Sequence, residues 1–356
     1  MKITSKLLML SLIVVVLGWT GCKNDESPDP TAVRYLDEMF DVDVDILFNK
    51  YAEADALVYT QPYSLSYQPL TYSQNLNFHL YQPENDTETN RPLVIFAFGG
   101  AYLLGTPLQP QIVNYARNLA KRGYVVACIE YRLGFDVFDE NTAIRALYRG
   151  SQDMVSAIRY FKGNAAEFGI DPDMIFIGGN SAGAVSSLHA AYASEAERAA
   201  HPLMAPTYVW EETWPDLGGV IDGNKDNSLG YETNGDYSIA AVLNLWGALG
   251  DLSIIDSPSD KPIISFFGSD DTTVSPNSAA PFEDVVETIP DIGPLENIGF
   301  PVLHGANPIH AHLNSMGIYN EKYEYAGEGH EPWTDGDIAH DIQDKSAEFM
   351  YYIMNL

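Results

Sequence analysis

Cysteine is almost absent from this chain, which has 356 residues and only two cysteines, Cys22 and Cys128. Two cysteines cannot build the disulfide framework typical of small secreted scaffolds. Cys128 lies within the apolar run Y-V-V-A-C-I-E-Y, so we expect a buried structural thiol there. The fold must therefore depend on an ordinary apolar core, and a hydrophobic content of 46% is sufficient for one.

Basic residues are also scarce, since 19 Lys and Arg face 49 Asp and Glu and leave a formal net charge of −30. Nucleic acids and anionic lipid surfaces would repel such a chain. The composition therefore argues against a nucleic-acid partner. The acidic excess is accounted for by solubility and says nothing about catalysis.

Apolar runs long enough to cross a bilayer are missing as well. Residues 7–17 are apolar apart from Ser11 and follow Lys2 and Lys6, but this stretch is too short for a stable membrane-spanning helix. Basic residues at the N-terminus followed by a short apolar run are typical of a secretory signal peptide. We therefore expect residues 1–21 to be a signal peptide and the mature chain to be exported.

The segment G-W-T-G-C that ends at Cys22 resembles the lipobox of bacterial lipoproteins, in which this cysteine is acylated. The polar, Pro-containing segment that follows it is similar to the tethers of surface lipoproteins of the Bacteroidota. The resemblance implies an acylated Cys22 with a flexible tether over residues 22–31, and a membrane contact through the lipid alone. Residues 32–356 are then one catalytic domain.

Short apolar runs alternate with helix-like stretches from about residue 75, and no internal repeat is present. Expected strands are 76–81, 92–98, 124–131, 174–177, 239–246, 262–267 and 322–325; expected helices are 111–121, 142–162, 182–193 and 338–353. This order predicts an α/β fold with a mostly parallel central sheet flanked by helices.

Two segments do not fit the alternation and are interpreted as insertions on the substrate side, at about 194–237 and 277–309. The first is lid-like and rich in aromatic residues, and includes Tyr208, Trp210, Trp214 and Tyr231. Residues 32–74 are expected to wrap around the domain as an N-terminal extension.

The pentapeptide G-N-S-A-G at residues 179–183 follows an apolar strand and precedes a small-residue helix. This is the context of a G-x-S-x-G nucleophile elbow, in which glycines allow a sharp turn between strand and helix. Ser181 is therefore the candidate nucleophile. The alternative is a glycine-rich turn whose serine only caps the helix.

The segment F-G-G-A-Y-L-L-G-T, residues 98–106, resembles the H-G-G-G-F-x-x-G-S segment of carboxylesterases and hormone-sensitive-lipase-like esterases. Phe98 and Ala101 stand where that family has His and its third Gly. The resemblance implies an α/β-hydrolase fold and an oxyanion hole formed by the backbone N–H groups of Gly100, Ala101 and Ala182.

A serine hydroxyl needs a general base, and in this fold the base follows the acid in the chain. Of eight histidines, His79, His189 and His201 come too early. His330 follows the strand K-Y-E-Y in a G-x-G-H-x-P-W loop similar to the histidine loop of these esterases, and is the candidate base. His310 and His312 form an H-x-H pair, which we interpret as solvated and not as a metal site.

Asp270 and Asp271 follow the apolar strand before Gly268 and are the candidates for the acid behind His330. The family pattern G-x-x-D-x-x-V selects Asp271 by its spacing to Gly268 and Val274, with Asp270 as the alternative. Arg132 in E-Y-R-L-G is expected to be a structural ion-pair partner.

The sequence thus predicts a serine carboxylic-ester hydrolase that needs no cofactor or metal and forms an acyl-enzyme on Ser181. Its expected substrates are short-chain esters or esters linked to carbohydrate or aromatic groups. Two alternatives stay open: a serine peptidase of the same fold, and a non-catalytic surface binding protein.

Overall fold

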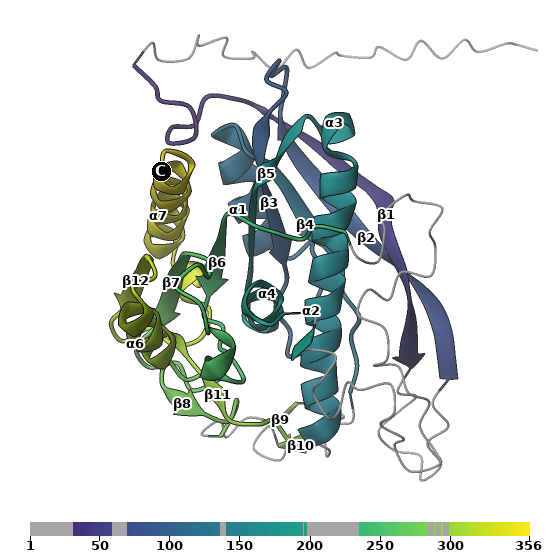
Figure 1. Ribbon diagram of the computed structural model, residues 1–356, viewed down its shortest axis with the longest axis vertical. Helices are drawn as coiled ribbons and strands as arrows, with labels where there is room; N and C mark the ends of the chain where they lie inside the picture. The colour runs from purple at the N-terminus through teal and green to yellow at the C-terminus, as the bar shows by residue number, and fades with distance from the viewer. Residues whose placement is uncertain are drawn as a thin grey trace, which may run out of the picture.

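One twisted sheet of eight strands forms the centre of the molecule, in the order β1-β2-β4-β3-β5-β6-β7-β12 (Figure 1). The computed structural model describes residues 31–58, 70–135, 140–194, 196–197, 235–283, 288–289, 293–294 and 299–356. The strands are β1 (Val42–Val58), β2 (Leu70–Pro83), β3 (Arg91–Ala97), β4 (Val125–Ile129), β5 (Ile170–Asn180), β6 (Ala241–Leu245), β7 (Ile263–Gly268) and β12 (Asn320–Tyr325). From β4 to β12 all neighbours are parallel, whereas β1 and β2 are antiparallel additions.

The central strands are buried on both faces, as their continuous apolar sequences require. Every residue of β3 and β4 is buried. Cys128 lies in β4 as a free, fully buried thiol, and burial raises its pKa. The expectation of a structural cysteine is therefore confirmed.

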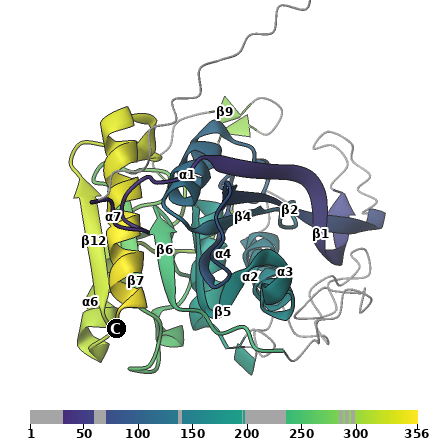
Figure 2. The ribbon, with the colours of Figure 1, turned by 90° about the horizontal axis from the view of Figure 1, so that it is seen from above.

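Helices cover the sheet on both faces. They are α1 (Pro110–Lys121), α2 (Glu140–Gly163), α3 (Ala165–Phe168), α4 (Ala182–Tyr192), α6 (Ala306–Met316) and α7 (Gly336–Met354). In the sheet, β4 lies on one side of β3, and β5 and β6 lie on the other. Right-handed crossovers therefore place α1 on one face of the sheet and α2 and α4 on the other face. In agreement, α1 contacts α7 and α2 contacts α4 (Figures 1 and 2). None of the described helices has the length and apolar character of a membrane span.

The seven strands and four long helices expected from the sequence are all present, most of them within about four residues of their expected bounds, whereas β2 begins six residues earlier, at Leu70. Two elements differ from expectation. Residues 42–58 form the edge strand β1 and do not merely wrap around the domain. The segment 277–309 contains the short strands β8 (Ser278–Ala279), β9 (Thr288–Ile289), β10 (Gly293–Pro294) and β11 (Leu303–His304), and it leads into α6, which was not expected.

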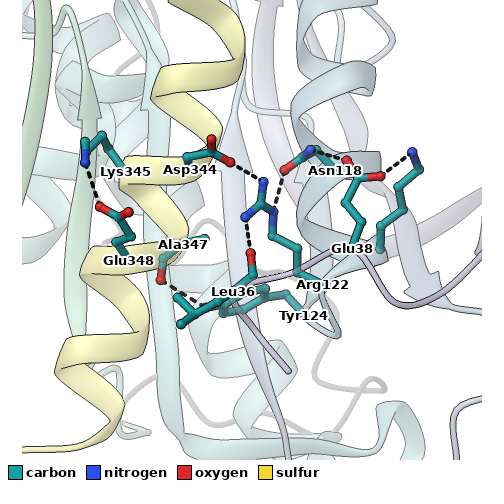
Figure 3. A network of polar contacts seen from close by, with 10 residues as sticks. Leu36, Glu38, Asn118, Arg122, Tyr124, Asp344, Lys345, Ala347 and Glu348 are labelled. Atoms are coloured by element: carbon teal, nitrogen blue, oxygen red, sulfur yellow. Dashed lines mark hydrogen bonds and ion pairs between the residues drawn. The ribbon is translucent and has the colours of Figure 1, made fainter. Parts of the chain in front are cut away.

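The segment before β1 is fastened to α1 and α7 by a polar network around Arg122 (Figure 3). The Arg122 guanidinium binds Leu36 O, Asn118 Oδ1 and Asp344, and therefore joins this segment to both helices. Glu38 accepts hydrogen bonds from Asn118 Nδ2 and Lys121 Nζ, each at 2.8 Å. The N-terminal segment is thus held at the end of α1.

Arg132 is buried in the core with only 2% of its surface exposed, and it pairs with Asp153 of α2. The two groups approach to 2.8 Å, and the backbone N–H of Arg132 also donates to Asp153 Oδ2 at 2.8 Å. Gln152 Oε1 accepts a further bond from the guanidinium. The structural ion pair expected for Arg132 is confirmed, and it fixes the loop after β4 to α2.

Substituting Asp153→Asn should lower the free energy of unfolding by about 3–5 kcal/mol, because it removes the carboxylate that pairs with the buried Arg132 charge. Urea denaturation measures this loss. Glu348→Gln is the control, since it removes the partner of Lys345 in an exposed pair and should change stability by less than about 1 kcal/mol. Equal losses in both variants would contradict the structural importance of the buried pair.

Candidate active site

Three side chains from distant parts of the chain meet at the carboxyl edge of the sheet. Ser181 follows β5, Asp271 follows β7 and His330 follows β12. Ser181 Oγ lies 2.9 Å from His330 Nε2, and His330 Nδ1 lies 2.8 Å from Asp271 Oδ2. The structure therefore brings together all three residues selected from the sequence as nucleophile, base and acid.

Ser181 occupies a backbone conformation that few residues other than glycine adopt, with φ 51° and ψ −124°. The turn is possible because its two flanking glycines have no side chain. A Cβ at Gly183 would lie 2.2 Å from Ala97 O, and a Cβ at Gly179 would lie 2.5 Å from the same atom. The helix α4 can therefore start directly against the end of β3, which is the geometry of a nucleophile elbow.

Asp271, and not Asp270, faces the histidine. The Asp271 side chain is completely buried, and its second oxygen accepts hydrogen bonds from the backbone N–H groups of Thr273 and Val274 at 2.9 Å. These bonds aim Oδ2 at His330. Asp270 is exposed, and its carboxylate binds Ser269 Oγ at 2.7 Å. Of the two candidate acids, the structure thus places Asp271 against His330.

The loop after β3 makes the unusual turn that the family resemblance implies. Gly100, Ala101 and Tyr102 all have positive φ, at 133°, 52° and 61°. No described residue accepts a hydrogen bond from the N–H groups of Gly100 or Ala101. Ala182 begins α4, where N–H groups have no partner within the helix. These amides can serve as oxyanion donors.

Aromatic side chains support this loop through ring stacking and hydrogen bonds. Phe98, which replaces the family's His, stacks on Tyr131 with ring centroids 4.5 Å apart, and Tyr131 OH donates to Phe98 O at 2.8 Å. Tyr102 OH donates to Ala182 O at 2.9 Å. Complete burial raises the pKa of Tyr102, so its phenol keeps the proton that it donates. The loop is therefore tied to the first turn of α4.

Two supporting residues were not selected from the sequence. Trp246 has φ 43° and is 2% exposed, and its ring is inclined at 73° to that of His330 at a centroid distance of 6.4 Å. Asn180, directly before the nucleophile, contacts both neighbouring loops. The sequence signal for Trp246 was a tryptophan at the end of an expected strand. The signal for Asn180 was its position within the nucleophile elbow.

The H-x-H pair lies in α6, and the expectation that it is solvated is wrong for His310. His310 is 2% exposed, its Nδ1 lies 2.7 Å from Asn320 Oδ1, and burial lowers its pKa to about 4. His312 Nε2 lies 2.9 Å from Ile255 O. Within the described ranges, no group of three or more His, Cys, Asp or Glu side chains converges as a metal site would require.

Some residues singled out in the sequence lie outside the described part of the chain. They are Cys22 with the tether before residue 31, and the aromatic residues Tyr208, Trp210, Trp214 and Tyr231 of the first insertion.

Comparison with known families finds that the BD-FAE family model matches residues 78–279. This interval covers the oxyanion loop, the elbow and the acid. Among curated proteins, gut esterase 1 of Caenorhabditis briggsae is 33% identical over 172 residues, which is 47% of this chain and 30% of that protein. Carboxylesterase 3B of Mus musculus is 36% identical over 118 residues, which is 32% of this chain and 20% of that protein.

The chain thus spans less than a third of the length of these curated relatives. Among solved structures, the propionate-bound esterase 2 of Thermogutta terrifontis aligns with a TM-score of 0.52 and 19% identity, over 84% of this chain and 94% of that one. The fold is therefore the α/β-hydrolase fold expected from the sequence. Together the comparisons support a serine ester hydrolase.

The buried His310 should make the protein less stable in acid. Its pKa in the folded chain, about 4, lies below the ordinary 6.5 because burial and Lys322 disfavour its charged form. The unfolded chain therefore takes up the proton first, and the free energy of unfolding should fall by about 3 kcal/mol between pH 6.5 and pH 4 from this group.

Urea denaturation of the wild type and of His310→Gln across this pH range isolates that contribution, because the carboxylates are common to both. His312→Gln is the matched control on the same helix and should keep the wild-type pH dependence. If His310→Gln also keeps it, the assignment to His310 is wrong.

Proposed function

We propose that this chain, which belongs to the BD-FAE family and has the α/β-hydrolase fold, is a serine carboxylic-ester hydrolase acting through Ser181, His330 and Asp271. The single observation that carries the proposal is the continuous hydrogen-bonded path from the buried Asp271 carboxylate through His330 to Ser181 Oγ. His330 lies 59 positions from Asp271 and 149 positions from Ser181 in the sequence, so the fold brings these residues together.

In the proposed mechanism His330 Nε2 takes the proton of Ser181 Oγ while that oxygen attacks the ester carbonyl carbon. The protonated imidazole then gives its proton to the departing alcohol, and an acyl-enzyme remains on Ser181. Water, deprotonated by His330, attacks this ester, and the protonated imidazole then returns the proton to Ser181 Oγ as the carboxylic acid leaves. Asp271 holds the imidazole with Nδ1 protonated and stabilises its cationic form.

The negative oxygen of each tetrahedral intermediate would lie against the N–H groups of Gly100, Ala101 and Ala182. Removal of one such donor raises an enzyme's barrier by about 3–4 kcal/mol. The donors are fixed before substrate arrives, because Tyr102 and Tyr131 bind the loop backbone and the start of α4. No cofactor takes part in this reaction.

We propose short-chain esters, or esters linked to carbohydrate or aromatic groups, as substrates. The propionate bound to the Thermogutta terrifontis esterase supports a short acyl part by analogy. Phe98, Tyr102 and Tyr131 are at most 3% exposed, so these aromatic residues support the oxyanion loop and offer almost no surface to a substrate.

We also propose that the chain is exported and held at a membrane surface by acyl groups on Cys22, on the basis of the lipobox-like segment. Metabolic labelling with a fatty-acid analogue should mark the wild type and not Cys22→Ser. Labelling of both would remove the proposed anchor site.

Ser181→Ala and His330→Ala should each lower kcat/KM for p-nitrophenyl acetate about a millionfold, and Asp271→Asn should lower it about ten-thousandfold. Asp270→Asn is the matched control and should stay within about threefold of the wild type, because Asp270 is exposed and does not contact His330. A fluorophosphonate probe should label the wild type and not Ser181→Ala.

Labelling of Ser181→Ala would disprove the assigned nucleophile, and equal losses in the two Asp variants would disprove the assigned acid. Failure of the wild type to react at all would favour a binding protein. Faster hydrolysis of aminoacyl p-nitroanilides than of esters would favour the peptidase alternative.

Acyl preference should favour short chains, with kcat/KM for acetyl or butyryl esters at least about tenfold above that for octanoyl esters, a difference of about 1.4 kcal/mol in transition-state binding. Initial rates on a panel of acetyl, butyryl, octanoyl, feruloyl and polymer-linked esters measure this. Dominant activity on long-chain emulsions would contradict it.

A further inference from the structure

Asn180 lies where the nucleophile elbow, the oxyanion loop and the histidine loop meet. It is the last residue of β5, directly precedes Ser181, and has no exposed surface. Its Oδ1 accepts a hydrogen bond from Gly99 N at 3.0 Å, and its Nδ2 donates to Glu331 Oε1 at 3.3 Å. Gly99 belongs to the oxyanion loop, and Glu331 directly follows His330.

Both hydrogen-bond partners of Asn180, Gly99 and Glu331, occupy sterically constrained backbone positions. A Cβ at Gly99 would lie 2.7 Å from Asn180 Nδ2 and 3.0 Å from Ser181 Cβ, so the loop backbone rests directly on the elbow. Glu331 is left-handed, with φ 62° and ψ 56°. This conformation is unfavourable for a residue with a Cβ. A hydrogen bond to the Glu331 side chain helps to hold the backbone that carries His330.

We propose that Asn180, acting through Glu331, is a positioning residue that holds the oxyanion loop and the histidine loop at fixed positions relative to Ser181. This inference rests on the proposed esterase function. Asn180 does not touch the reacting atoms. Its effect is to fix the distances from Ser181 Oγ to the base on one side and to the amide donors on the other.

The chemistry of the side chain explains why an amide suits this position. One side chain must accept from a backbone N–H and donate to a carboxylate, and a carboxamide does both. Aspartate could accept from Gly99 N but could not donate to Glu331 when ionised. Two carboxylates at this distance repel each other, and the pKa of one rises strongly.

Asn180→Asp therefore provides a test that a merely structural role would not satisfy. At pH 8 both carboxylates are charged and the two loops should be pushed apart, so kcat should fall about a hundredfold while KM changes less than threefold. As the pH falls to 5.5 one carboxyl becomes protonated and can donate to the other. The ratio of variant to wild-type kcat should then rise about tenfold.

Asn85→Asp is the matched control, because Asn85 Nδ2 also lies beside a glutamate, Glu84, at 3.5 Å, but on an exposed turn. Its kcat ratio should stay near one at every pH. The double variant Asn180→Asp/Glu331→Gln restores a donor opposite the new carboxylate. It should regain activity to within about fivefold of the wild type at pH 8 and lose the pH-dependent ratio.

Glu331→Ala tests the pair if Asn180→Asp does not fold, and it should lower kcat about tenfold with little change in KM. A flat ratio for Asn180→Asp, or an unchanged kcat for Glu331→Ala, would overturn the positioning role while leaving the esterase intact. A wild type that neither hydrolyses p-nitrophenyl acetate nor reacts with a fluorophosphonate would instead refute the proposed function.

Discussion

The close backbone contact between the end of β3 and the start of α4 is the constraint on which the rest of the site depends. Gly179 and Gly183 both lie so near Ala97 O that any side chain would overlap it. This contact forces the turn that gives Ser181 its positive φ, and it brings the loop after β3 beside the first amides of α4. Nucleophile and oxyanion donors are thus consequences of a single packing requirement, which only glycine satisfies.

The parallel sheet supplies the second half of the arrangement. Because β5, β7 and β12 run in the same direction, the loops that leave their carboxyl ends share one edge, where Ser181, Asp271 and His330 meet. Burial is graded along this path, since the Asp271 side chain is fully buried and the His330 side chain is 18% exposed. The carboxylate is therefore fixed by the protein, whereas the imidazole borders the space from which substrate and water arrive.

Three of the cations in the described part of this acidic chain hold segments of the fold together. Arg132 is paired with Asp153 in the core, Arg122 joins the N-terminal segment to α7, and Arg34 binds Asp86 through two hydrogen bonds. Each of these pairs fastens a loop or a terminal segment to the central layers. With only 19 basic residues in the chain, much of the acidic excess is left to the surface, where it opposes association with other polyanions.

By itself the sequence determined the buried strands, the elbow at Ser181 and the histidine loop, because apolar runs and glycine spacing are local signals that hydrophobic burial and backbone sterics dictate. Family spacing added Asp271. The edge strand β1 and helix α6 were missed, since their polar and mixed patterns form regular structure only through pairing with β2 and packing against β12 and β7. Tertiary structure showed which of Asp270 and Asp271 contacts His330, and it alone decided that His310 is buried and that Asn180 bridges Gly99 and Glu331. These contacts depend on which distant segments pack together. A local sequence pattern does not determine where a side chain points in such a tertiary contact.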